Sequence, residues 1–276
     1  MVANSNTSAL PVPVQTLSVP GQPPLELRVW GRKVRGQSSP LVLHFHGGAF
    51  VSGDLDSGAC LAELLTSAGA VVASLAYPLA PAHPFPEALE AGYAALEWLY
   101  KQRTRLAGTG APLFVAGEEA GGNLAAALAL MVRDRAHPPL AGQILVSPML
   151  DPCNATASLR ETMGQATGCK WIDGWQQYLR GPMDAEHPYA VPGRAQRLAG
   201  LPPALILTGG DDPMRDEALA YAERLRAAGI HVSSELLPPT TGWPDSLAET
   251  PTECPCAAEV RGQLRAFFQA AAPPPA

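Results

Sequence analysis

The stretch VAGEEAGGNLAAALAL, from Val115 to Leu130, decides the fold expected for this chain. It reads as an apolar strand, a turn bracketed by glycines and an alanine-rich helix. A strand, turn and helix of this kind present a nucleophile when the turn has the pattern G-x-S-x-G. Here the turn reads Gly-Glu-Glu-Ala-Gly, so Glu119 stands at the central position. The turn therefore keeps the shape of a catalytic elbow and lacks the serine.

Composition limits the class of protein and its partners. The chain has 276 residues, of which 47% are apolar and 16% charged, and this is typical of a globular domain with a large core. A net charge of −6 argues against nucleic acid or an anionic membrane as a partner. The longest apolar run, 124–132, is too short to span a membrane. No signal peptide is evident at the N-terminus, so we expect a cytoplasmic protein.

Strand-like and helix-like segments alternate along most of the chain, which predicts a mostly parallel sheet with helices on both faces in one domain, 1–276. The expected strands are 14–19, 25–30, 41–45, 70–77, 112–117, 143–146, 204–208 and 232–236, and the expected helices are 58–68, 88–98, 120–133, 215–228 and 257–270. The stretch 151–200 breaks the alternation, and we expect a loop-rich inserted cap there with one helix near 171–180. Residues 271–276, rich in proline and alanine, are expected to be disordered.

Five blocks in the chain resemble the hormone-sensitive-lipase group of α/β hydrolases. They are HFHGGAFVSGD (44–54), YPLAPAHPFPEAL (77–89), GEEAGGNLAAALAL (117–130), LPPALILTGGDDPMRDEALAYAERLRAAGI (201–230) and PPTTGWPDSL (238–247). Their order and spacing follow the family over nearly the whole length of the chain. The resemblance implies an α/β-hydrolase fold with a small inserted cap over the site.

Members of that family are mostly carboxylesterases that use serine, aspartate and histidine in this chain order. The resemblance places the acid at Asp212, the nucleophile position at Glu119 and the base position at Thr241. The last histidine of the chain is His231, so no histidine occupies or follows the base position. Loss of the nucleophile or the base lowers the turnover of a serine hydrolase about a million-fold. A conventional serine esterase is therefore excluded.

The resemblance also implies an oxyanion hole, the set of amides that stabilises the transition state of ester cleavage. The N–H groups of Gly48, Ala49 and Ala120 would form it, with Gly47 in the same loop. Backbone amides survive changes of side chain, so these residues predict an intact binding cradle beside Glu119. The positive end of the helix that begins at Ala120 adds to the preference of this cradle for an anion.

Two catalytic roles are conceivable for Glu119. As a carboxylate nucleophile it would form an ester that needs a general base for its removal, and Thr241 cannot be that base near neutral pH. As a general acid or base it would work with Asp212 in proton transfer or a lyase reaction, which requires one of the two carboxyl groups to stay protonated. The cradle favours the ionised form of Glu119 and so argues against this second role.

In the interpretation we favour, the carboxylate of Glu119 folds back onto the cradle amides and fills the space of a substrate carbonyl. Plant gibberellin receptors resemble these esterases, lack the histidine and bind a small molecule in the old active site. The chain is then a ligand-binding or regulatory pseudoenzyme for a small acid or ester. The non-enzymatic alternative is a structural or interaction protein that binds a protein partner or forms a homodimer.

For other side chains near these motifs we expect structural roles. His46 belongs to the HGG loop and is expected to brace it, and His44 is expected to pack on a strand face. Trp171, Trp175 and Tyr178 have helical spacing, which usually means core packing, and a place in the roof of the pocket is the other reading. No spacing of ligands indicates a metal, and no cofactor is expected.

Overall fold

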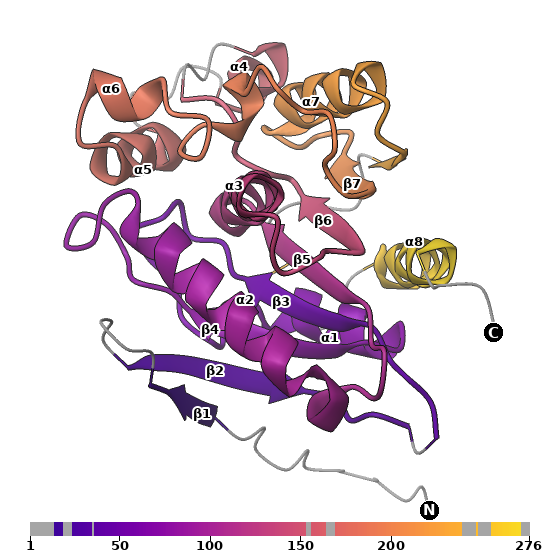
Figure 1. Cartoon of the computed structure of the whole chain (residues 1–276). Helices are drawn as coiled ribbons and strands as arrows, with labels where there is room; N and C mark the ends of the chain where they lie inside the picture. The colour runs from indigo at the N-terminus through magenta and orange to yellow at the C-terminus, as the bar shows by residue number, and fades with distance from the viewer. Residues whose placement is uncertain are drawn as a thin grey trace, which may run out of the picture.

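The computed structural model describes residues 14–18, 24–34, 36–152, 156–163, 169–238, 247 and 255–271 (Figure 1). Within these residues one sheet has the strand order β1-β2-β4-β3-β5-β6-β7-β8. The strands are β1 Val14–Leu17, β2 Leu25–Trp30, β3 Leu41–Phe45, β4 Val71–Ala76, β5 Leu113–Glu118, β6 Gly142–Val146, β7 Ala204–Gly209 and β8 Val232–Leu237. Strand β2 is antiparallel to β1 and β4, and the pairs from β4 to β8 are parallel. The predicted, mostly parallel sheet is confirmed.

Helices cover both faces of this sheet (Figure 1). Helices α1 (Ala59–Ser67) and α8 (Ala257–Ala270) share one apolar cluster on one face. Helices α2 (Glu87–Leu106), α3 (Ala120–Arg135) and α7 (Arg215–Ala227) belong to a larger cluster on the other face. The central strands therefore point alternate side chains into two separate cores, which explains why they are almost entirely apolar.

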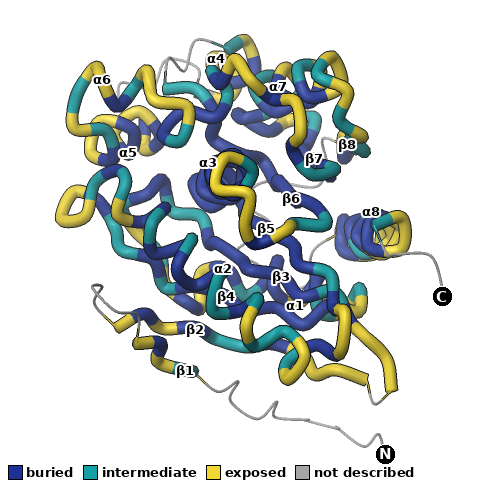
Figure 2. The backbone as a smooth tube through the Cα atoms, viewed as in Figure 1, coloured by how far each residue is buried: buried dark blue, intermediate teal, exposed yellow. Residues whose placement is uncertain are grey.

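Helix α3 lies at the centre of the molecule, and Figure 2 shows it buried over most of its length. Every residue from Ala120 to Val132 is buried. The many alanines and glycines in this helix have little side-chain volume, so strands, α2 and the cap can all approach it closely. The small residues of 120–130 thus allow close packing around the helix, and they also allow the sharp turn that precedes it.

The stretch 151–200, which was expected to form a cap and is called the cap below, contains more helices than expected. It contains α4 (Ala157–Met163), α5 (Lys170–Tyr178), α6 (Pro182–Ala185) and a single turn of 3₁₀ helix, Pro192–Arg194. The prediction of one helix in this stretch is therefore wrong, although α5 matches it. Helices of four to seven residues make too few turns for an apolar period to appear in sequence.

Some predictions fall at the limits of the described residues. The sequence predicts a disordered tail from Ala271, but this residue is the C-cap of α8. Its N–H donates to the carbonyl oxygen of Phe267 at 3.1 Å. Residues 272–276 lie outside the described residues, and so does Thr241. In the part of the chain that the structure describes, no helix combines the length and apolar character needed to cross a membrane.

Candidate functional site

Glu119 lies on a sharp turn between β5 and α3, at the carboxyl edge of the parallel strands. Its backbone has φ 55° and ψ −116°, a conformation that residues with a side chain rarely adopt. Two glycines permit the turn. A Cβ on Gly117 would lie 2.2 Å from the carbonyl oxygen of Gly121, and one on Gly121 would lie 2.1 Å from that of Phe45. The strained elbow of a hydrolase is thus retained, with a glutamate at its tip.

The Glu119 carboxylate is held by donors from two other segments. Its Oε2 accepts hydrogen bonds from the amides of Gly48 and Ala49, the latter at 3.0 Å. Its Oε1 accepts one from the indole N–H of Trp171, and the ammonium of Lys170 lies 3.6 Å away. Glu119 is only 8% exposed, so both oxygens face protein donors and little water. The side chain links the HGG loop to the start of α5.

The structure thus brings together Glu119 and two of the three amides assigned to the oxyanion hole. Ala120 follows directly as the first residue of α3, and Gly47 uses its amide differently, donating to Oε1 of Glu118 at 3.2 Å. Ala49 has φ 50°, a left-handed conformation. The backbone can therefore present this amide despite the methyl group that replaces the glycine usual in the family.

Helix α5 approaches the HGG loop closely because of one glycine. A Cβ on Gly174 would lie 2.2 Å from the carbonyl oxygen of Ala49 and 2.8 Å from its Cβ. Phe50, which follows Ala49 in the HGG loop, stacks on Tyr178 with ring centroids 4.0 Å apart. It also packs on Trp175 with centroids 5.0 Å apart. Trp175 and Tyr178 are therefore core residues of the cap interface, as their spacing predicts. Trp171, from the same helix, bonds Glu119 and takes the alternative place in the roof of the site.

A buried polar chain supports the other side of the elbow. Glu118 Oε2 lies 2.8 Å from Nε2 of His44, and Nδ1 of His44 lies 2.9 Å from the hydroxyl of Ser74. The indole N–H of Trp30 donates to the same hydroxyl at 3.0 Å. His44 and Ser74 are at most 2% exposed, so this chain is structural and connects the four strands β2, β3, β4 and β5 through satisfied hydrogen bonds. His44 does more than pack on a strand face.

His46 braces the HGG loop, as expected. Its Nδ1 lies 2.6 Å from the carbonyl oxygen of Gly47, and its ring stacks on Tyr77 at 4.3 Å. The Tyr77 hydroxyl donates to the carbonyl oxygen of His46 at 2.8 Å. Burial lowers the pKa of His46, which favours the neutral ring. Nδ1 and one face of this imidazole therefore contribute to holding the loop.

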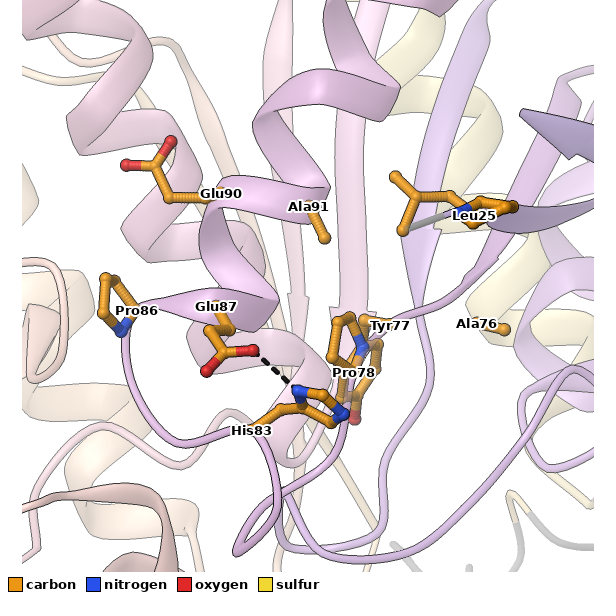
Figure 3. Close-up of a pocket in the computed structure, with 10 residues that line it drawn as sticks. Leu25, Ala76, Tyr77, Pro78, His83, Pro86, Glu87, Glu90 and Ala91 are labelled. Atoms are coloured by element: carbon orange, nitrogen blue, oxygen red, sulfur yellow. Dashed lines mark hydrogen bonds and ion pairs between the residues drawn. The ribbon is translucent and has the colours of Figure 1, made fainter. Parts of the chain in front are cut away.

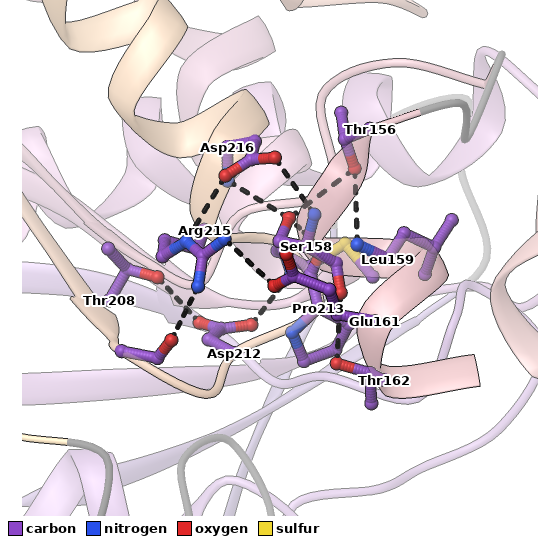
Figure 4. Close-up of polar contacts among 12 residues, drawn as sticks. Thr156, Ser158, Leu159, Glu161, Thr162, Thr208, Asp212, Pro213, Arg215 and Asp216 are labelled. Carbon is purple, nitrogen blue, oxygen red and sulfur yellow. Dashed lines mark hydrogen bonds and ion pairs between the residues drawn. The ribbon is translucent and has the colours of Figure 1, made fainter. Parts of the chain in front are cut away.

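Asp212 follows β7 and is fully buried, with its carboxylate occupied by protein donors (Figure 4). Oδ2 accepts hydrogen bonds from the hydroxyls of Ser147 and Thr208, the latter at 2.7 Å. Oδ1 accepts one from the amide of Met214 at 2.8 Å. Burial raises the pKa of Asp212, and these hydrogen bonds oppose the rise. The residue that the resemblance places as the acid is thus buried and bonded to neighbours other than a histidine.

The segment after Asp212 also anchors the cap (Figure 4). The hydroxyl of Ser158, in α4, donates to the carbonyl oxygen of Pro213 at 2.9 Å, and its amide donates to Asp216 at 2.8 Å. Arg215 pairs with Glu161 of α4 at 3.2 Å. Helix α4 is therefore fastened to the start of α7, so the acid loop and the cap form one unit.

The carboxylates and imidazoles around the site form hydrogen bonds with other groups of the protein. Within the described residues, no three histidine, cysteine, aspartate or glutamate side chains could together hold a metal ion. Sequence reasoning missed three groups that contact the site, namely Lys170, Ser147 and Thr208. Ser147 and Thr208 each lie where a strand ends at the edge that bears the site, and this position was the signal that could have found them.

Glu217 on α7 makes stability depend on pH. Its Oε2 accepts hydrogen bonds from the amides of Leu150 and Asp151 at 2.8 and 2.7 Å, and burial raises its pKa from 4.5 to about 8. The folded protein thus holds this proton more tightly than the unfolded chain does. The resulting stability is complete below pH 4.5 and is lost as the pH rises through about 8.

We expect the free energy of unfolding to fall by about 2 kcal/mol between pH 6 and pH 9, which urea unfolding measures. In Glu217→Gln the amide oxygen still accepts both backbone N–H groups and no longer titrates. The fall should then become much smaller. An equally steep fall in the variant would show that another group causes it.

The comparisons with known proteins agree with this geometry. A family model described as alpha/beta hydrolase fold matches residues 42–241. The chain belongs to this family, in its hormone-sensitive-lipase branch. A structure of a thermostable esterase from Pseudomonas putida superimposes with a TM-score of 0.81 at 31% identity, over 94% of this chain and 83% of that one.

Two curated relatives show what the family contains. Esterase LipI from Mycobacterium tuberculosis is 40% identical over 199 residues, which are 70% of this chain and 62% of that protein. Gibberellin receptor GID1 from Oryza sativa is 34% identical over 207 residues, 70% of this chain and 57% of the receptor. The matches thus span less than two thirds of either relative. Enzymes and a receptor share the fold and much of the sequence.

Proposed function

We propose that this protein is a catalytically degenerate, carboxylesterase-like α/β hydrolase that acts as a ligand-binding or regulatory protein. The observation that carries the proposal is the position of Glu119. Its carboxylate accepts hydrogen bonds from the amides of Gly48 and Ala49, which are the donors that ester cleavage would need for the oxyanion. An ester carbonyl cannot use donors that a side chain of the protein already occupies.

The remaining positions of the family triad support the same interpretation. Asp212 accepts hydrogen bonds from Ser147, Thr208 and a backbone amide, and Thr241 stands at the base position. A threonine hydroxyl does not accept a proton near neutral pH, so no base would activate a nucleophile or a water. The relative named as a gibberellin receptor supports a receptor-like use of this fold, here for a small acid or ester.

The contacts of Glu119 disfavour its alternative role as a nucleophile or a general base. A carboxylate attacks with a free lone pair. In Glu119, however, Oε2 accepts hydrogen bonds from two amides. Oε1 accepts a hydrogen bond from the Trp171 indole and lies 3.6 Å from the ammonium of Lys170. Each of these donors withdraws charge from the oxygen that would react. The same donors make Glu119 well suited to hold the HGG loop against α5.

Hydrolysis of p-nitrophenyl acetate and butyrate tests the proposal. We expect the purified protein to show no turnover above the buffer rate, because the hydrogen-bonded Glu119 stands at the nucleophile position and Thr241 at the base position. Glu119→Ala should lose nothing, and Glu119→Gln, which keeps the size of the side chain, serves as its matched control. Turnover by the wild-type protein that disappears in Glu119→Ala would make Glu119 catalytic and refute the proposal.

A further inference from the structure

A cavity of about 410 Å³ lies between β2, the end of β4 and the start of α2 (Figure 3). Pockets of this size hold small organic molecules. One wall is apolar and the opposite end is polar. The apolar wall includes Leu25, Ala76, Pro78 and Ala91. Neither Glu119 nor Asp212 lines this cavity, so it is separate from the site described above.

The polar end of the cavity is acidic. Glu87 Oε2 lies 2.6 Å from Nδ1 of His83, and the two side chains are 53% and 47% exposed. Glu90 also lines the cavity and pairs with Arg135 at 2.8 Å. The described lining contains no lysine or arginine, so a cationic group entering here meets carboxylates first. Figure 3 shows the Glu87 carboxylate directed toward the His83 ring.

Tyr77 connects this cavity to the Glu119 site. It lines the cavity, donates its hydroxyl to the carbonyl oxygen of His46 at 2.8 Å and stacks on the His46 ring. His46 in turn holds Gly47, next to the amide of Gly48 that bonds Glu119. A molecule in the cavity would therefore contact a residue that supports the HGG loop.

We propose that this cavity is a binding site for a small amine with an apolar body. The body fills the space against Leu25, Ala76 and Ala91, and the ammonium group donates to the Glu87 carboxylate in place of His83. Most of the affinity comes from burial of the apolar body, since the charged pair is partly exposed and screened by water. The charge sets the preference of the site for a cation over an anion.

Phenethylamine and 3-phenylpropionate test this preference because they share a ring and a linker and carry opposite charges. In NMR titrations we expect phenethylamine to shift the methyl signals of Leu25, Ala76 and Ala91 saturably. We expect 3-phenylpropionate to bind at least about three-fold more weakly. Glu87→Gln should remove that difference. Ala76→Leu fills the cavity and should weaken the binding of phenethylamine about ten-fold or more.

Two variants serve as controls. Glu97→Gln makes the same chemical change on α2 outside the cavity and should leave the dissociation constant unchanged. Glu223→Gln makes the change on α7, also outside the cavity, and should leave it unchanged as well. The test measures binding and not hydrolysis, so its outcome is independent of that of the proposed function. The inference is overturned by failure of phenethylamine to bind, by equal binding of the two probes, or by shifts at other methyl groups. If Ala76→Leu does not fold, the loss of charge preference in Glu87→Gln decides.

Discussion

The double variant Glu119→Ser, Thr241→His is expected to hydrolyse p-nitrophenyl acetate on the order of 100-fold faster than the buffer rate, which is the rate expected with the wild-type protein. Serine is shorter than glutamate, so it vacates the amides of Gly48 and Ala49 and leaves them to an oxyanion. The elbow already has the backbone that a nucleophile needs, with φ 55° at position 119. The histidine would supply the base, with Asp212 at the acid position of the family pattern.

The single variants distinguish a restored catalytic triad from a site in which only the amides of Gly48 and Ala49 have become free. Glu119→Ser alone lacks a base, and Thr241→His alone lacks a nucleophile, so each should remain within a few-fold of the wild-type rate, because triad members act as a unit. Circular dichroism and thermal melting confirm that each variant is folded. A folded double variant without any gain would mean that the site differs from an esterase at more than these two positions.

Gly121→Ala is expected to lower the free energy of unfolding by about 3 kcal/mol or more. The added Cβ would lie 2.1 Å from the carbonyl oxygen of Phe45 and 2.5 Å from that of His46. Both are backbone atoms at the carboxyl end of β3 and cannot rotate away. The elbow or β3 must therefore move, and urea unfolding followed by circular dichroism measures the cost.

Gly262 offers the matched control. It lies in α8, and a Cβ there would meet no heavy atom within 4 Å. Gly262→Ala should raise the free energy of unfolding by about 0.5 to 1 kcal/mol, because alanine favours a helix over glycine by that amount. If the two variants changed stability alike, close packing at Gly121 would not be the reason for its glycine.

Much of the fold follows from local sequence patterns. The apolar run before the turn, the glycines at 117 and 121 and the alanine-rich segment after them predict a strand, an elbow and a buried helix, and the structure has all three. Such elements depend on residues close in sequence, so their periodicity and turn chemistry appear directly in the letters. The replacement of serine by Glu119 is also read from sequence alone, since it needs only the position in the turn.

Only the tertiary structure decided what Glu119 does with its carboxylate. The donors come from Gly48 and Ala49, some 70 residues earlier in the chain, and from Trp171, 52 residues later. Likewise Asp212 meets Ser147 from 65 residues away. Sequence spacing contains no record of such contacts, because parallel strands bring distant loops to one edge of the sheet and the cap then closes on them. The short cap helices α4 and α6 show no apolar period in the sequence, so only the structure reveals them.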